Sequence, residues 1–303
     1  MADSNLPLVT IGILSFNRRD DLRLTLDVVT RAIQYPSFEV LVIDNSSSDG
    51  SLEMMREEFP TVRVFEVGSN LGMPARNFQT KLARGKYLFS YDDDSYPGTP
   101  AMILRMVQFM EAHENIAALS GTCYRPITDY EETGEWPWYR HRVLNVNQFA
   151  GIFLVEGGVC FRLDSLRKVD GYGAAFVRGK DGMDLGLQLF KADLTMCLCL
   201  SFLTLHLASN LHRSNKATRY YEGRHTIWCI AKHWPIVWTP PLAFLWFIRR
   251  LLAFFIHPMT GLAGLKGIFD GIKGVWPYIR YRPKLTWRQA FKLGRYYFYI
   301  FRW

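Results

Sequence analysis

Three consecutive aspartates, Asp92, Asp93 and Asp94, follow the apolar run 86–91 (KYLFSY). Carboxylates this close repel one another, which raises their pKa values unless a cation neutralises the cluster. Mg²⁺ and Mn²⁺ prefer carboxylate and phosphate oxygens, so Asp92 and Asp94 could share such an ion with the pyrophosphate of a nucleotide. The ion would act as a Lewis acid on a leaving diphosphate. The alternative is a solvated turn in which one aspartate caps the next helix.

The aspartates end the last of four apolar runs that alternate with helical patterns. The strands are expected at 8–14, 40–44, 62–67 and 86–91, and the helices at 20–34, from the turn NSSSDG to about 59, and from 74 to about 84. Strands that alternate with helices indicate a mostly parallel sheet with helices on both faces, and ligands bind beyond the carboxyl ends of such strands. Asp44 and Asn45 fall at a second strand end.

Two common nucleotide-binding motifs are missing. No GxGxxG follows the first strand, which argues against a dinucleotide-dependent oxidoreductase, and no GxxxxGK[ST] occurs, which argues against a P-loop enzyme. The five cysteines lack metal-site spacing and are expected to be reduced and buried, as in a cytosolic protein. The start of the sequence has no basic segment followed by an apolar stretch, so we expect no signal peptide.

Three segments together resemble the amino-terminal blocks of family-2 glycosyltransferases, in the same order and spacing: VTIGILSFN, LVIDNSSSDGS and NLGMPARNFQTKLARGKYLFSYDDDSYP. The resemblance covers about 9–100 well and continues more loosely to about 235. It implies a GT-A fold, which is a Rossmann-like α/β fold with a mostly parallel central sheet. It also implies an inverting transfer from a nucleotide-activated sugar.

The resemblance assigns roles to individual residues of the first half. Ser15, Phe16 and Asn17 stand where the family contacts the nucleoside, and Asp44 matches the acid that reads the base. Arg76 and Asn77 match an Ala-Arg-Asn motif near the nucleotide. Asp93 and Asp94 match the DXD-like positions, with Asp94 as the foremost metal ligand and Asp92 beside it. His206, in HLAS, matches a histidine that completes the metal or diphosphate site better than His212 does.

The second half carries a candidate general base. The segment 157–189 resembles a segment of the family in which a strand leads through a GGFD-like turn to a Glu-Asp pair at the start of a helix. Here Asp170-Gly171-Tyr172-Gly173 replaces the turn and Lys180-Asp181 replaces Glu-Asp, so Asp181 aligns with the base and Asp184 with a helix-capping acid. An inverting transfer needs a group that takes the proton of the acceptor hydroxyl. The alternative is that Asp181 only caps the helix.

The last third is basic and aromatic. Residues 240–303 hold eleven Lys or Arg and one acid, so this tail has a charge of +10 and residues 1–239 have 8 − 10 = −2. Arginines 249 and 250 interrupt the apolar run 242–256, where each would cost about 2.5–3.5 kcal/mol in a spanning helix. The sequence favours a helix that lies in the plane of the membrane surface, with its arginines reaching lipid phosphates. Further on, Thr286 and Gln289 have the spacing of a capping box, which predicts the start of another helix. A tail folded onto the catalytic domain, or a dimer interface, is the alternative.

These observations predict three parts: 1–100 binds the nucleotide sugar, 101–239 binds the acceptor, and 240–303 associates with a membrane through amphipathic helices. The predicted function is metal-assisted glycosyl transfer, with Mg²⁺ or Mn²⁺, from a nucleotide-diphosphate sugar to a glycan or lipid-linked acceptor. The expected location is the cytoplasmic face of the plasma membrane, as a peripheral protein on an anionic surface. A non-catalytic sugar-nucleotide or glycan binder is the alternative. Nucleic-acid binding is disfavoured, because aromatic and leucine residues crowd the basic tail.

Overall fold

The computed structural model describes residues 6–125, 130–132, 143–145, 148–151, 157–207, 215–281 and 283–297. Its first part is a parallel sheet in the order β3-β2-β1-β4. The strands are β1 (Val9–Ser15), β2 (Phe38–Asp44), β3 (Arg63–Glu66) and β4 (Tyr87–Asp92). The connecting helices are α1 (Arg19–Arg31), α2 (Ser51–Glu58) and α3 (Arg76–Leu82), the last preceded by the short η1 (Met73–Ala75). The predicted order of strands and helices in this part is confirmed.

The register of the parallel strands brings their polar ends to one edge. Ser15 of β1 lies opposite Asp44 of β2, and Leu14 lies opposite Asp92 of β4. Buried apolar side chains fill both faces behind that edge. Ile11, Ile13 and Phe89 belong to one core cluster, and Leu14, Leu41 and Ile43 belong to the other. Because the strands are covered on both sides, their sequences read as continuous apolar runs and the first polar residues mark the strand ends.

Beyond β4 the sheet becomes mixed. It continues in the order β10-β6-β11-β9-β8, with β10 antiparallel to β4 and β6, and β11 parallel to β6. The added strands are β5 (Ser95–Pro97), β6 (Ile116–Arg125), β7 (Tyr130–Glu132), β8 (Val143–Asn145), β9 (Gln148–Gly151), β10 (Val159–Arg162) and β11 (Thr195–His206). The helices of this part are α4 (Met102–Ala112), α5 (Leu163–Leu166) and α6 (Asp181–Lys191).

The apolar pattern of residues 150–163 also predicts a strand, and this prediction is wrong for the run as a whole. The two ends of that run belong to different strands, because β9 pairs with β11 and β8 whereas β10 pairs with β4 and β6. Gly158, just before β10, lies close to β11. A Cβ on it would lie 2.4 Å from the hydroxyl of Thr204, so β11 passes too close for any larger residue.

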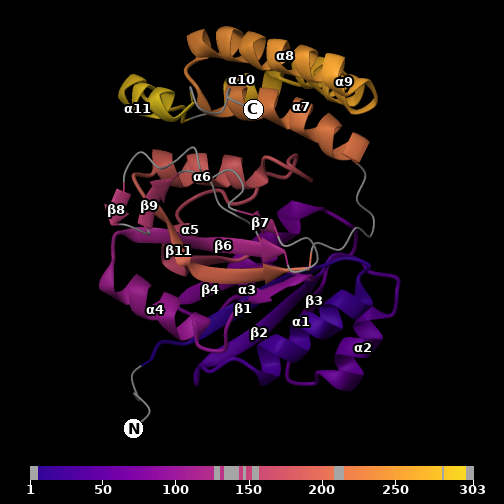
Figure 1. Cartoon of the computed structure of the whole chain (residues 1–303), viewed down its shortest axis with the longest axis vertical. Coiled ribbons are helices and arrows are strands. Elements are labelled where there is room, and N and C mark those ends of the chain that lie inside the picture. Colours follow the sequence, from indigo (N-terminus) through magenta and orange to yellow (C-terminus); the bar gives the residue numbers. More distant parts are fainter. Residues whose placement is uncertain are drawn as a thin grey trace.

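A layer of helices covers α6 on the side away from the sheet (Figure 1). It comprises α7 (Asn215–His233), η3 (Ile236–Trp238), α8 (Thr239–Ile256), α9 (Pro258–Lys273), α10 (Trp276–Arg280) and α11 (Trp287–Tyr297). The tail shares a hydrophobic core with α6, to which it contributes Leu242, Leu285 and Leu293. The capping box is confirmed, since Thr286 N donates to Gln289 Oε1 at 3.0 Å and Gln289 N donates to Thr286 Oγ1 at 3.2 Å.

One arginine of the tail departs from its predicted role. Arg250 is buried, and its guanidinium donates to Glu222 Oε2 of α7 at 2.9 Å. It therefore does not reach outward to lipid phosphates, as the sequence suggested for both arginines. The reason is that α8 packs on α7 through this side, and a carboxylate on the facing helix supplies the partner that the sequence pattern of α8 alone does not reveal.

Helices α7 and α9 approach closely because glycines line their contact. A Cβ on Gly267 would lie 2.0 Å from the carbonyl oxygen of Tyr220, and one on Gly223 would lie 2.3 Å from that of Gly264. Backbone atoms cannot move aside as a flexible side chain can, so these positions tolerate no side chain without a shift of one helix against the other.

We predict that Gly267→Ala lowers the stability of the protein by about 1–3 kcal/mol, because the added methyl group forces α9 away from α7. Gly264→Ala is the matched control on the same helix. A Cβ there meets nothing nearer than 3.4 Å, so the gain in helix propensity, about 0.5–1 kcal/mol, should keep its stability equal or raise it. Thermal melting of the two full-length variants measures the difference. Equal melting temperatures would contradict the close packing.

Candidate active site

Asp92, Asp94 and His206 come together at the end of the sheet. One side-chain ligand atom from each lies within 4.8 Å of the others. His206 Nε2 is 3.2 Å from Asp94 Oδ1, and both side chains are buried. The pairing of β5 with β11 makes this contact, because Ser95 lies opposite His206 and Leu207 N donates to the Asp94 carbonyl at 2.9 Å. The backbone therefore fixes a histidine beside an acid 112 residues earlier in the chain.

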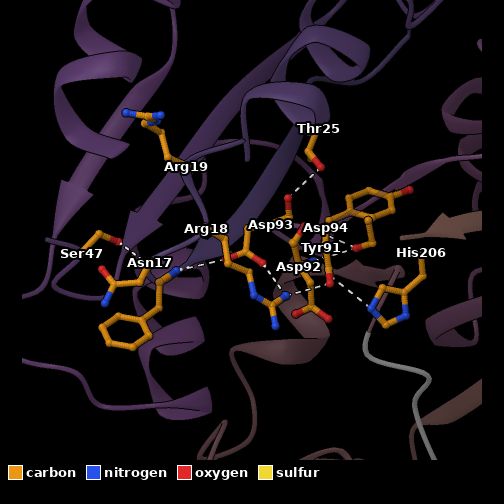
Figure 2. Close-up of polar contacts among 12 residues, drawn as sticks. Asn17, Arg18, Arg19, Thr25, Ser47, Tyr91, Asp92, Asp93, Asp94 and His206 are labelled. Atoms are coloured by element: carbon orange, nitrogen blue, oxygen red, sulfur yellow. Dashed lines mark hydrogen bonds and ion pairs between the residues drawn. The ribbon is translucent and has the colours of Figure 1, made fainter. Parts of the chain in front are cut away.

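Arg18 is a site residue that the sequence reasoning missed. Its Nη1 lies 2.7 Å from Asp94 Oδ2 and 3.2 Å from Asp93 Oδ1, so one guanidinium bridges two carboxylates (Figure 2). Arg19 points away from the cluster and pairs with Asp20 at 3.2 Å. The missed signal was a cation just past the end of β1, at the same sheet edge as the acids.

Asp93 faces the loop after β1 rather than His206. Its Oδ2 accepts the Phe16 N–H at 3.1 Å, and its carbonyl accepts the Thr25 hydroxyl at 2.8 Å (Figure 2). Burial raises the pKa of Asp93 to about 7, and the neighbouring carboxylates act in the same direction while Arg18 opposes them. This residue connects the aspartates to the loop in which the predicted nucleoside contacts lie.

Arg76 is a buried partner of Asp92. Its Nη2 donates to Asp92 Oδ1, and its Nη1 donates to Ser90 Oγ at 2.5 Å and to the Tyr91 carbonyl at 3.1 Å. The guanidinium thus orients Asp92 from behind β4. Asn77, next in the motif, exchanges two hydrogen bonds of 2.8 Å with the backbone of Tyr172, which ties α3 to the turn 170–173.

Two loops, one after β1 and one after β2, form the part of the site that is predicted to contact the nucleoside, and hydrogen bonds join them to each other. Asn17 adopts a positive φ of 51°, its N–H donates to Ser47 Oγ at 3.0 Å, and its Oδ1 accepts the Ser48 N–H at 2.7 Å. Asp44 is buried at the end of β2, where its Oδ2 accepts the Ser47 N–H at 2.9 Å. Within the described residues its Oδ1 has no hydrogen-bond partner. A buried carboxylate oxygen of this kind suits an N–H donor on a nucleobase.

Asp181 is the first residue of α6 and is buried. The residue before it, Lys180, has a positive φ of 68°, so the chain turns sharply into the helix. His225 of α7 supports this turn: its Nδ1 is 3.0 Å from the Arg178 carbonyl and 2.9 Å from that of Gly179. Burial lowers the pKa of His225 to about 4, so at neutral pH the ring is uncharged and Nδ1–H donates to these carbonyls.

Asp184, one turn after Asp181, joins α6 to α7. Lys232 Nζ lies 2.8 Å from its Oδ1, His233 Nε2 lies 2.7 Å from the same atom, and Gln188 Nε2 donates to its Oδ2 at 2.9 Å. All of these side chains are buried. His233, Lys232 and their hydrogen bonds hold the pKa of Asp184 below its usual range. Asp184 is thus an inter-helix anchor as well as an acid in the first turn.

From the sequence, Arg219, Arg224 and Lys232 could face diphosphates, with a solvated basic helix as the alternative. In the fold, two of these side chains pack against other residues. Lys232 is the buried partner of Asp184. The guanidinium of Arg224 stacks on the rings of Tyr221 and Trp228, with its central carbon 4.9 and 4.6 Å from their centroids. Packing of α7 against α6 and α9 explains both. The sequence also offers Trp136, Trp138 and Tyr139 as a stacking platform for an acceptor sugar, with buried packing as the alternative. These three residues and His212 lie outside the described residues.

The chain is similar to known proteins in sequence and in fold. Residues 10–169, more than half of the chain, match the model of glycosyl transferase family 2. The chain belongs to this family. It is also 29% identical over 113 residues to a poly(ribitol-phosphate) beta-glucosyltransferase of Bacillus spizizenii strain W23. That match covers 35% of this chain and 18% of the Bacillus protein, so the chain spans about a fifth of that relative.

Solved structures confirm the GT-A type of fold for this family-2 chain. A mannosyltransferase from Pyrobaculum calidifontis, in complex with GDP-Man and Mn²⁺, superposes with a TM-score of 0.59 at 16% identity over 96% of this chain and 79% of that one. Residues 1–349 of TarS from S. aureus give a TM-score of 0.55 at 15% identity over 73% of this chain and 65% of that one. At these identities the likeness concerns the fold alone.

The residues at the sheet edge fit a divalent cation. Two carboxylates and one imidazole offer ligand atoms within 4.8 Å of one another. The carboxylate oxygens are the donors that Mn²⁺ and Mg²⁺ prefer, and the imidazole adds one nitrogen donor. A second cluster, Asp184 with Cys229 and His233, has similar spacing. It is less suitable, because Lys232 already neutralises the carboxylate and burial raises the pKa of the Cys229 thiol.

We predict that Arg18→Gln raises the affinity for Mn²⁺ by about tenfold or more, because a unit positive charge a few Å from the cation contributes on the order of 1–4 kcal/mol of repulsion. Without metal the variant should melt at a lower temperature, since Asp93 and Asp94 lose their counter-charge, and Mn²⁺ should raise its melting temperature more than that of the wild type. Titration calorimetry and thermal melting measure both effects. Arg19→Gln is the control and should match the wild type; identical behaviour of both variants would exclude competition between Arg18 and the metal.

Proposed function

We propose that this protein is an inverting, metal-assisted glycosyltransferase that takes a sugar from a nucleotide-diphosphate donor. The observation that carries the proposal is the convergence of Asp92, Asp94 and His206 at the carboxyl edge of a GT-A sheet. Family membership supports glycosyl transfer. The similar mannosyltransferase structure is a complex with GDP-Man and Mn²⁺, and a similar TarS structure is a complex with UDP-GlcNAc. Both support a donor of this class, and the first supports a divalent cofactor.

The donor would lie across the edge of the sheet. Asp44 would accept a hydrogen bond from the base, and the loop of Ser15, Phe16 and Asn17 would contact the nucleoside. A metal held by Asp94, Asp92 and His206 would neutralise the leaving diphosphate. Arg76 would keep Asp92 oriented, and Asp93 would link the nucleoside loop to the metal ligands.

Asp181 would act as the general base. A carboxylate at the first turn of α6, on a loop supported by His225, is held in one orientation and can take the proton of an acceptor hydroxyl as that oxygen attacks the sugar. Asp184 would contribute indirectly, by fixing the start of α6 against α7 through Lys232 and His233. Single displacement by this route inverts the anomeric configuration.

The acceptor is proposed to be a glycan or a lipid-linked glycan at the cytoplasmic face of the plasma membrane. The surface of the tail supports this placement. Fifteen large apolar side chains between positions 236 and 291 are exposed, among them Phe244, Leu252 and Phe255, against three in the rest of the described chain. The helix Ile236–Ile256 has the length and hydropathy of a membrane span. Arg249 near its centre favours an in-plane position, whereas Arg250 is paired with Glu222 inside the protein.

The second candidate is a membrane-bound protein that binds a sugar nucleotide or glycan without turnover. Lys180, where the family has an acid, favours it. The two functions differ in whether a donor is consumed, so assays of donor turnover with candidate acceptors separate them directly.

We predict that Asp94→Asn abolishes the Mn²⁺-dependent part of donor binding and reduces transfer by at least a hundredfold, because the variant loses a charged metal ligand. Calorimetry with a panel of nucleotide diphosphates, with and without Mn²⁺, measures the binding. Asp20→Asn is the control, since its exposed carboxylate lies on α1 outside the cluster. Unchanged metal-dependent binding in Asp94→Asn would refute the site.

We predict that Asp181→Asn lowers kcat by about 10²–10⁴-fold with little change in donor affinity, as expected for a group that acts in the transition state. Asp184→Asn should instead destabilise the protein by about 3–5 kcal/mol, because it leaves Lys232 buried without its carboxylate. Steady-state kinetics and thermal melting of both variants test the division. If Asp184→Asn melts normally and loses kcat while Asp181→Asn stays active, the base has been assigned one turn too early.

A further inference from the structure

Two adjoining cavities lie among α7, α8 and α9, which pack together in the helical layer (Figure 1). Their volumes are about 860 and about 840 Å³, and they share the lining residues Arg219, Ile256, His257 and Thr260. The first is the more polar and includes Asn215, Thr218 and Glu222. The second is lined by Leu245, Ile248 and Leu252 beside Arg249 and Arg250. Together they form a space that is basic in its centre and apolar along α8.

The charges of this space favour an anion. Arg219, Arg249 and Arg250 line it against one acid, Glu222, which leaves a net charge of +2 with His257 neutral. Glu222 is already shared between Arg219 and Arg250, at 2.9 Å from each. A phosphate monoester, which carries about −1.5 to −2 charges at pH 7, would complement the remaining positive charge, whereas a zwitterionic phosphodiester headgroup has no net charge to offer. Guanidinium groups are well suited to phosphate oxygens.

The apolar wall that α8 contributes to the second cavity indicates which kind of molecule the bound anion belongs to. Leu245, Ile248, Leu252 and Ile256 are exposed on α8, where they continue from the second cavity onto the apolar surface of the tail. A soluble phosphate would leave this wall in water, whereas a hydrocarbon chain attached to the phosphate would cover it. We propose that the cavity between α7, α8 and α9 binds the phosphate headgroup of a membrane lipid, with the lipid chain lying along α8.

The proposal rests on the membrane placement proposed above and gives it a position relative to the donor site. Asn215 lines the cavity and follows His206 by nine residues, a length of chain that spans at most about 30 Å. A lipid phosphate held here would therefore keep the metal-binding edge within about 30 Å of the membrane surface. That distance suits an acceptor presented at the surface.

The test is binding of the full-length protein to phosphatidylcholine vesicles, with and without a minor fraction of phosphatidic acid, followed by sedimentation. The wild type should bind both and prefer the vesicles that contain phosphatidic acid. Arg219→Gln/Arg249→Gln should weaken binding to those vesicles by about tenfold or more, because each guanidinium would lose its charge-assisted hydrogen bonds to the lipid phosphate. Its binding to pure phosphatidylcholine should be unchanged. Arg250 is left in place because it is buried against Glu222.

Lys266→Gln/Lys273→Gln is the matched control, because it removes the same charge from α9 at positions that do not line the cavities. It should keep most of the preference for phosphatidic acid; equal loss in both double variants would mean general electrostatic attraction and overturn the proposal. So would competition by inorganic phosphate or a short oligonucleotide as strong as that by phosphatidic acid in detergent micelles. If the wild type binds no vesicles, the membrane placement itself fails. Donor binding and turnover, measured in parallel, report separately on the proposed enzyme.

Discussion

The repulsion among three adjacent carboxylates at the end of β4 is the constraint on which the rest of the site depends. Asp93 and Asp94 are almost completely buried, and a buried carboxylate requires a nearby positive charge or hydrogen-bond donors. Three basic side chains from three different elements meet this requirement: Arg18 from the start of α1, Arg76 from α3 and His206 from β11. Each holds a different part of the cluster, and this arrangement leaves Asp92 and Asp94 directed toward a common point.

Some features of this site could be predicted from the sequence and others could not. The parallel strands and their helices were predicted correctly, because each produces a local pattern in the sequence. The strand patterns end at polar residues, as at Asp44 and Asp92. The three-dimensional neighbours were harder to predict. The meeting of Asp94 with His206 depends on the pairing of β5 with β11, and the family resemblance, rather than periodicity, indicated it. The assigned roles of Asp181, Asp44 and the nucleoside loop remain predictions.

Three features could not be read from local patterns. The bridge from Arg18 to two aspartates depends on a side-chain direction that the sequence does not specify. Lys232 resembles a solvated base until Asp184, 48 residues earlier, is placed against it. The division of the run 150–163 between β9 and β10 depends on their partners, since β9 pairs with β11 whereas β10 pairs with β4 and β6. In each case a partner distant in sequence determines the outcome, and only the assembled fold identifies it.

Part of the helical layer reverses the usual distribution of polar and apolar side chains, although Leu242, Leu285 and Leu293 are buried in the core. Glycines bring α7 and α9 together, and the contact of α7 with α8 buries the ion pair between Arg250 and Glu222. The opposite faces of α8 and α9 expose Leu252, Phe255 and Leu262. In water these exposed apolar side chains would be expected to be buried and Arg250 to be exposed. It is consistent with an environment that accepts hydrocarbon on one side, because the ion pair is then shielded by protein and the apolar face has a solvent suited to it. The same packing that stabilises α7, and with it the turn before Asp181, therefore produces the surface that would face a membrane.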